Sequence, residues 1–241
     1  MSVPIATTLG LGFVLGLRHA LDADHVAAVA ALNESREGFR RALVNGFSWG
    51  VGHALTLGAA GGLALALRSA IPDRLALLFE FGVGLMLIVL GSAALRGSLR
   101  DRLHVHAHRH DDVSHSHLHF HAARHRAGEP APHRHPHAIR FALRPFLVGG
   151  AHGLAGSAAL ALLVLTEVPT VLAGCLYLLV FGAGSTAGMT LMSLVLGAPL
   201  VIAQRRALWL ARGLRAAAGL GSLGIGLTIL WETGVTGGLF G

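Results

Sequence analysis

Six apolar segments dominate the sequence and limit what this chain can fold into. Each is about 20 residues long or longer, which is the length a helix needs to cross the hydrocarbon core of a bilayer. They lie at residues 3–32, 42–67, 73–95, 142–166, 169–203 and 208–231. Of the 241 residues, 53% are hydrophobic and 33 are glycines, and small residues let membrane helices approach closely. We therefore expect an all-α integral membrane protein with six transmembrane helices, built as one domain.

The first apolar segment contains four closely spaced ionisable residues: His19, Asp22, Asp24 and His25. Charged groups inside a membrane span are costly and usually mark an ion or proton pathway. Imidazole and carboxylate together suit a divalent first-row transition metal better than calcium or magnesium. In a straight helix Asp24 would point away from the other three, so it joins them only where the helix unwinds. The alternative is a structural charge cluster of Arg18, Asp22 and Asp24, with the histidines merely nearby.

Two further histidines lie in apolar segments, and both are flanked by glycines. His53 follows glycines at 50 and 52, which allow another backbone to come close, and Thr56 shares its helical face. His152 lies between Gly150 and Gly153. Either histidine is a candidate further metal ligand, and the alternative for each is a hydrogen bond to a neighbouring carbonyl group.

Arginine supplies all of the formal charge of +7, because the chain has no lysine. The arginines concentrate in the connections after the first, third and fifth apolar segments, which indicates that these connections are cytoplasmic and that both termini lie outside. This distribution explains the basic charge without a nucleic-acid partner.

We expect Trp49, Trp209 and Trp231 to lie at the membrane interfaces and Glu80 and Glu167 to be solvated near span ends. The single cysteine, Cys175, excludes an intrachain disulfide and any multi-cysteine metal site.

The two halves of the chain, residues 1–96 and 141–241, resemble each other. His19 aligns with His152 and Phe47 with Phe181, at offsets of 133 and 134 residues. Since each half has three spans, the copies would insert with opposite orientation and form a 3+3 inverted repeat. The charges do not repeat, because Asp22, Asp24 and His25 align with residues 155, 157 and 158, which are Ala, Ser and Ala. We also expect a kink or break in the fifth segment at its glycine-rich stretch, residues 182–188.

The connection between the halves, residues 97–140, contains 12 of the 16 histidines, at positions 104, 106, 108, 110, 115, 117, 119, 121, 125, 133, 135 and 137. Dense imidazole binds nickel, zinc, copper or cobalt with little geometric selectivity. The connection has three prolines and few apolar residues, so we expect it to be disordered. It is then either a cytoplasmic metal buffer or a solvated linker with no required role.

Three stretches resemble the nickel/cobalt transporter family. The first is the His-x4-Asp-His pattern of His19, Asp24 and His25, and the second is the glycine-rich sequence around His53. The stretch from Val148 through His152, together with the histidine-rich connection, is similar to the six-span, urease-accessory-type nickel permease branch. Residues 153–158, Gly-Leu-Ala-Gly-Ser-Ala, replace an acidic motif of the eight-span members.

The resemblance implies transport of nickel, and also of cobalt, across the bacterial cytoplasmic membrane. It further implies a transporter rather than an enzyme, no permanently bound cofactor, and a link to urease or hydrogenase maturation. No ATP-binding motif is visible in the sequence, which favours a secondary carrier or a channel-like path over a pump. The family's metal role falls on His19, Asp24 and His25, and then on His53. A zinc or other divalent-metal efflux carrier remains an alternative. A histidine-box membrane metalloenzyme fits less well, because the loop histidines alternate without helical spacing.

Overall fold

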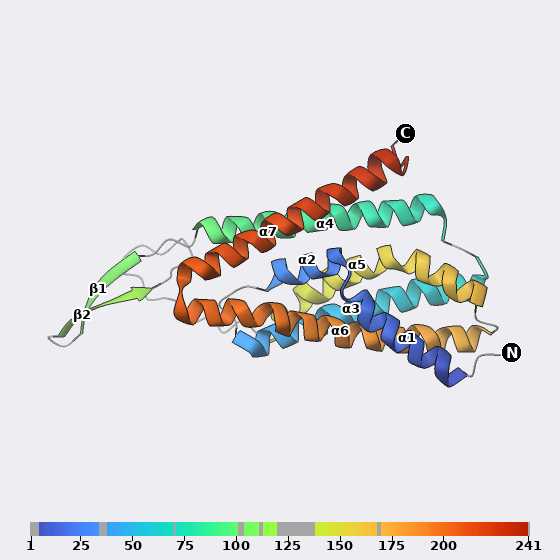
Figure 1. Cartoon of the computed structure of the whole chain (residues 1–241), viewed down its shortest axis with the longest axis horizontal. Coiled ribbons are helices and arrows are strands. Elements are labelled where there is room, and N and C mark those ends of the chain that lie inside the picture. The colour runs from blue at the N-terminus through green and yellow to red at the C-terminus, as the bar shows by residue number, and fades with distance from the viewer. Residues whose placement is uncertain are drawn as a thin grey trace.

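A computed structural model describes the backbone of residues 5–33, 38–69, 71–100, 104–110, 113–119, 138–167 and 170–240. Nearly all of these residues are helical, and the helices run roughly along one common direction (Figure 1). Both termini lie at the same end of the helices. Loop histidines 121, 125, 133, 135 and 137, and the side chain of Glu167, lie outside the described part.

The first apolar segment is not one helix but two. Helix α1 (Ile5–His19) ends at the first ionisable residue, and α2 (Ala23–Leu32) begins directly after Asp22. In the turn between them the amide of Leu21 donates to the Arg18 carbonyl at 2.8 Å, and Asp22 has an extended backbone. This confirms the expectation that the helix unwinds next to Asp24.

Helices α3 (Gly38–Leu67), α5 (Ala138–Glu167) and α6 (Val171–Arg206) form one tightly packed group with α1. Helix α3 contacts both α5 and α6, and α1 lies against α6. The contact between α3 and α5 requires glycine, because a Cβ atom at Gly52 would collide with the Phe146 carbonyl oxygen. The expected close approach of another backbone beside His53 is therefore present.

Helices α4 (Asp73–Arg100) and α7 (Leu208–Trp231) form a second pair, with a short π-helical segment, η1 (Glu232–Thr236), at the end of α7. The buried hydroxyl of Ser222 donates to the Leu87 carbonyl oxygen at 2.9 Å and ties the two helices together. Helix α2 contacts both helices of this pair and also α6. Its position between the two groups places the broken first segment at the centre of the protein (Figure 1).

The end of α2 is fixed by a buried polar cluster. The amide of Asn33 donates to the Ser193 carbonyl at 3.0 Å. The Ser193 hydroxyl lies 2.7 Å from the Ala42 carbonyl and 3.2 Å from the Asn33 amide oxygen. These bonds join α2, α3 and α6 in an interior where an unpaired polar group would be costly.

Of the kink or break expected at residues 182–188, the break is absent. Helix α6 continues through this stretch from Val171 to Arg206. The glycines there serve close packing instead, since a Cβ atom at Gly184 would collide with the Phe13 backbone of α1. The Thr186 hydroxyl also donates a hydrogen bond to the Gly182 carbonyl at 2.8 Å.

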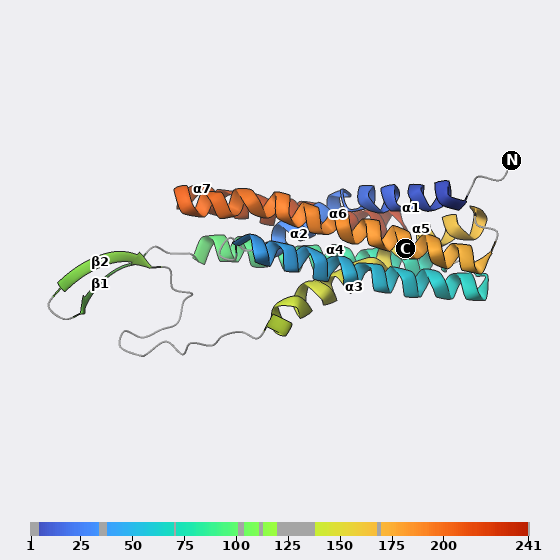
Figure 2. The same ribbon diagram turned by 90° about the horizontal axis from the view of Figure 1, so that it is seen from below.

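We had expected the histidine-rich connection to be disordered, but part of it forms two strands. Strands β1 (His104–His110) and β2 (Val113–His119) form an antiparallel hairpin beyond the end of the helices that lies opposite both termini (Figure 2). In its register His104 is paired with His119, His106 with His117 and His108 with His115. Alternation of histidine with other residues matches the two-residue period of a strand, and this favours pairing over a random chain.

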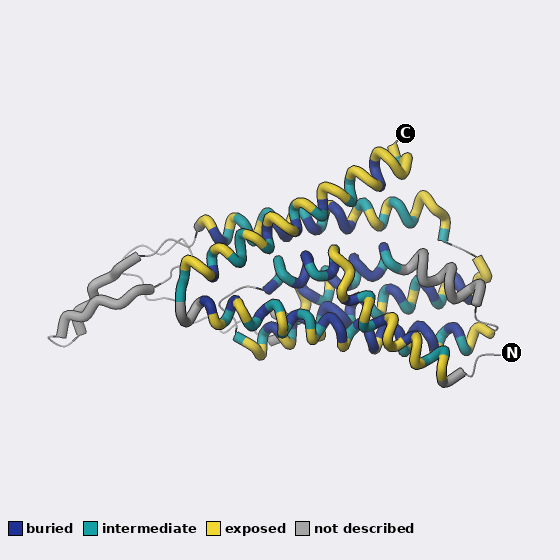
Figure 3. Tube along the Cα trace, viewed as in Figure 1, coloured by how far each residue is buried: buried dark blue, intermediate teal, exposed yellow. Residues whose placement is uncertain are grey.

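Four of the described helical stretches are long and apolar enough to cross a membrane: Gly38–Leu67, Asp73–Leu99, Val171–Ala203 and Leu208–Thr236. Their outer surfaces are apolar too. Leu63, Val89 and Leu179 are 60%, 64% and 70% exposed, and exposed residues follow the outer sides of the helices in Figure 3. So continuous an apolar surface is unfavourable in water and favourable in lipid. This is therefore an integral membrane protein.

Candidate metal site

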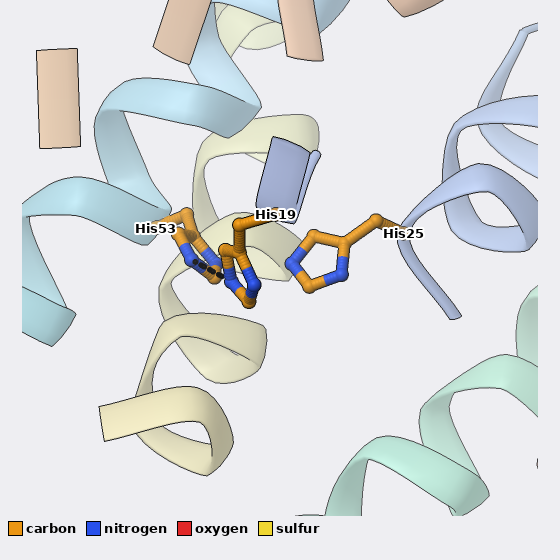
Figure 4. Close-up of side chains that lie close together, drawn as sticks. All are labelled: His19, His25 and His53. Carbon is orange, nitrogen blue, oxygen red and sulfur yellow. Dashed lines mark hydrogen bonds between the residues drawn. The ribbon is translucent and has the colours of Figure 1, made fainter. Parts of the chain in front are cut away.

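The four histidines outside the long connection converge in one place. They come from the end of α1 (His19), the start of α2 (His25), α3 (His53) and α5 (His152). The rings of His25 and His152 have centroids 4.2 Å apart, and those of His19 and His25 are 4.4 Å apart. Figure 4 shows the rings of His19, His25 and His53 pointing toward one another. The break between α1 and α2 makes this possible, because it lets His19 and His25 approach the same point.

Asp24 holds two of these histidines. Its Oδ1 atom accepts hydrogen bonds from the backbone amide and Nδ1 of His25, each at 2.9 Å. Its Oδ2 atom lies 2.8 Å from Nε2 of His152. The carboxylate therefore fixes His25 in the tautomer whose Nε2 carries a free lone pair.

Asp22 has a similar relation to a single histidine. Its Oδ2 atom lies 2.8 Å from Nδ1 of His19, and its side chain is 55% exposed. With its Nδ1 proton directed to Asp22, His19 presents Nε2 to Nε2 of His53 at 3.2 Å. Among the described residues no ion pair joins Arg18 to Asp22 or Asp24. The carboxylates thus orient histidines, which argues against the structural charge cluster.

Two overlapping sets of donor atoms could hold a metal ion. In the first set, His19, His25 and His53, one nitrogen from each lies within 4.8 Å of the others. The second set, Asp24, His25 and His152, meets the same limit. His25 belongs to both sets and is only 2% exposed, and its Nε2 has no hydrogen-bond partner among the described residues. A buried imidazole nitrogen with a free lone pair is an available metal ligand.

Aromatic side chains close the site from the protein interior. Trp49 is 1% exposed, with its ring centroid 5.5 Å from that of His25 and 5.7 Å from that of His152. Our expectation that Trp49 lies at a membrane interface is therefore wrong, whereas Trp209 and Trp231 are exposed at 76% and 63%. The Phe181 ring lies 5.5 Å from that of His19. These rings restrict access to the histidines from α3 and α6.

A cavity of about 570 Å³ opens on the opposite side of the site. Three of the four histidines, His19, His25 and His152, line one part of it, and residues of α4, α7 and η1 line much of the rest. Two carboxylates that sequence reasoning did not assign to the site, Glu80 and Glu232, lie in its wall. The signal that could have found them is the one used for Asp22 and Asp24, namely an ionisable residue within an apolar segment.

One known relative covers almost the whole chain. The urease accessory protein UreH of Bacillus sp. (strain TB-90) is 33% identical over 238 residues, which are 99% of this chain and 96% of that protein. This chain belongs to the UreH family. The membership confirms the resemblance to the urease-accessory-type branch of the nickel/cobalt transporters. No family model matches the chain, and no solved structure matches it either.

In this UreH-family protein, five of the six predicted site residues belong to at least one of the two donor sets: His19, Asp24, His25, His53 and His152. Asp22 lies in neither set and touches the site through His19. His152, which is the second half's contribution, is joined to the first half by its bond to Asp24. The scaffold thus gathers residues 133 positions apart at one point.

Proposed function

We propose that this chain is a permease that carries nickel, and also cobalt, across the bacterial cytoplasmic membrane, with nickel supplied to urease maturation. The observation that carries the proposal is a cluster of four buried or half-buried imidazoles and one carboxylate within apolar segments. Nitrogen-rich sites of this kind suit Ni²⁺ and Co²⁺. The relation to a urease accessory protein favours nickel as the cargo and a carrier over an enzyme.

In our proposal the ion exchanges part of its water shell for Nε2 atoms of His19, His25 and His53. Asp22 and Asp24 then act behind the ligands, because each accepts a hydrogen bond from the opposite nitrogen of a ligating ring. Such carboxylate partners fix the ring orientation and make imidazole a better donor. His152 and Asp24 form the neighbouring set to which the ion can pass, with His25 common to both. Ligating histidines must be neutral, so acid conditions weaken binding.

We further propose that the chain crosses the membrane six times, as a 3+3 inverted repeat, with both termini outside and the histidine-rich connection in the cytoplasm. The packing supports this, because α1 lies on α6 while α5, its counterpart, lies on α3. The Phe13 backbone packs against Gly184, and the Phe146 backbone, 133 residues later, packs against Gly52. Transport by a secondary carrier then follows from rocking of one half against the other around the site.

The histidine-rich connection acts, in this proposal, as a cytoplasmic metal buffer. The three histidine pairs in register along the backbones of β1 and β2 support it. The buffer is separate from the transport path, because the hairpin lies beyond the end of the helices (Figure 2).

Uptake of radioactive nickel by cells that make the protein tests the function. We expect accumulation to change relative to cells without it, with a rise meaning import and a fall meaning export. His25→Ala should abolish the change while membrane insertion is retained, because it removes the ligand common to both sets and adds no charge. Competition by zinc that exceeds competition by cobalt would favour the efflux-carrier alternative. Wild-type flux in His25→Ala would remove this residue from the mechanism.

A further inference from the structure

Four acidic residues lie in the wall of the cavity beside the histidines. Asp22 and Asp24 line it near the break in the first segment, Glu80 projects from α4, and Glu232 lies at the start of η1. None of the described residues that line it is an arginine. Carboxylates lining a cleft with low-dielectric walls concentrate cations within it.

Glu80 and Glu232 lie in segments that otherwise read as membrane spans. Glu80 is in the second turn of α4 next to Phe79 and Phe81, and Glu232 follows Trp231. Both are exposed, and in contact with lipid their charges would be costly. The cavity resolves this, because it gives both carboxylates a polar space shared with the metal site.

Electrostatics favour a cation in that space. Asp24 and Glu232 are both near enough to Glu80 to repel its carboxylate. A divalent cation among them relieves this repulsion, and carboxylates accept a cation that still holds most of its water. The acidic wall therefore suits an ion before it is dehydrated, whereas the imidazoles suit it afterwards.

A second observation shows where such an ion would go. His25 also lines the cavity, is 2% exposed, and leaves its Nε2 without a partner among the described residues. The carboxylates of Glu80 and Glu232 lie toward the end of α4 and α7 that also carries both termini (Figure 1). The cavity thus has carboxylates toward one face of the protein, and its wall also includes His25, a histidine of both donor sets.

The local backbone supports a special role for this end of α7. The helix changes to π geometry at Glu232, and the Thr233 hydroxyl donates to the Ile229 carbonyl at 2.7 Å. Both Ile229 and Thr233 line the cavity. Short π-helical segments are rare in proteins, and those that occur are often found at functional sites.

We propose that Glu80 and Glu232 form an outer capture site that draws a hydrated divalent cation into this cavity from the face carrying both termini and delivers it to His25. The identity of the cation as nickel rests on the function proposed above. The capture site itself rests on the cavity and its carboxylates.

The first test is the concentration dependence of nickel flux in Glu80→Gln, Glu232→Gln and the double variant. We expect KM to rise several-fold in each single variant and further in the double, with the maximal rate kept, because capture is weakened and the inner ligands are intact. Asp73→Asn, at the start of α4 and outside the cavity wall, is the matched control and should keep the wild-type KM. An unchanged KM in the double variant would overturn the proposal.

The second test does not depend on the cargo. Thr228, which lines the cavity, is replaced by cysteine in a Cys175→Ala background, and intact cells are treated with thiol reagents that cannot cross the membrane. We expect a cationic methanethiosulfonate to react several-fold faster than an anionic one, and the preference to shrink when Glu80 and Glu232 are both glutamine.

The two tests separate the two proposals. Equal rates for both reagents, or a preference that survives the double substitution, would overturn the capture site whatever the flux shows. A preference that depends on the glutamates in a protein that moves no nickel would support the capture site and reject nickel transport.

Discussion

At the scale of the residue, the site is explained by which nitrogen each histidine leaves free. Asp24 accepts hydrogen bonds from His25 Nδ1 and His152 Nε2, and Asp22 accepts one from His19 Nδ1. The consequence is that His19 and His25 both present Nε2 toward His53. The two carboxylates of the predicted site thus have related but unequal tasks.

This inequality gives a graded prediction. Asp24→Asn should weaken nickel binding by roughly 10- to 100-fold, because it releases the orientation of two rings. Asp22→Asn should weaken it less, since that side chain is 55% exposed and orients only His19. Titration calorimetry with purified protein lacking residues 104–137 measures both, without nickel bound by the connection. The account fails here if Asp22→Asn has the larger effect.

At the scale of the element, glycine decides how closely the helices that carry the histidines can approach. Gly52 precedes His53 and lies against the Phe146 backbone of α5. Gly153 follows His152 and lies against the His53 carbonyl. Each histidine of this pair is therefore adjacent to a point where the two backbones meet.

Gly52→Ala should destabilise the protein by about 1–3 kcal/mol, the usual range for overpacking a close contact. Its melting temperature in detergent should fall, and nickel affinity should fall with it because His53 is displaced. Gly58→Ala on the same helix is the control, since a Cβ atom there meets nothing within 4 Å and alanine favours the helix. Equal melting temperatures for the two variants would show that the α3–α5 contact does not need glycine.

Sequence patterns predicted much at this scale, and their failures have physical causes. Hydropathy located the helices, and the spacing of His19, Asp24 and His25 indicated that the first segment must unwind. The glycines of α6 were misread, because glycine permits both a break and a close contact and only the neighbouring α1 decides between them. The burial of Trp49 depends on helices distant in sequence, so hydropathy could not reveal it.

At the scale of the whole molecule, the histidines divide between a buried cluster and the connection between the halves. Four histidines meet between α1, α2, α3 and α5, and the other twelve lie in the connection between the halves. The composition of this connection predicts disorder, but the alternation of its histidines matches the strand pairing of β1 and β2. Composition alone could not distinguish these two outcomes.

Deletion of residues 104–137 should therefore preserve nickel transport while altering apparent affinity or regulation. The expectation follows because the hairpin lies beyond the end of the helices and contributes nothing to either donor set. Nickel uptake by cells that produce the shortened protein in the membrane provides the measurement. Loss of transport in a correctly inserted protein would show that the connection belongs to the transport path.

The central claim is that a divalent ion exchanges water for imidazole at the point where His19, His25 and His53 meet. X-ray absorption at the nickel edge tests it most directly, on purified protein without residues 104–137 so that only the buried site contributes. We predict one nickel per chain with the scattering pattern of imidazole ligands, and loss of that pattern in His25→Ala. A nickel ion surrounded by oxygen alone, or a spectrum that His25→Ala leaves unchanged, would contradict the account.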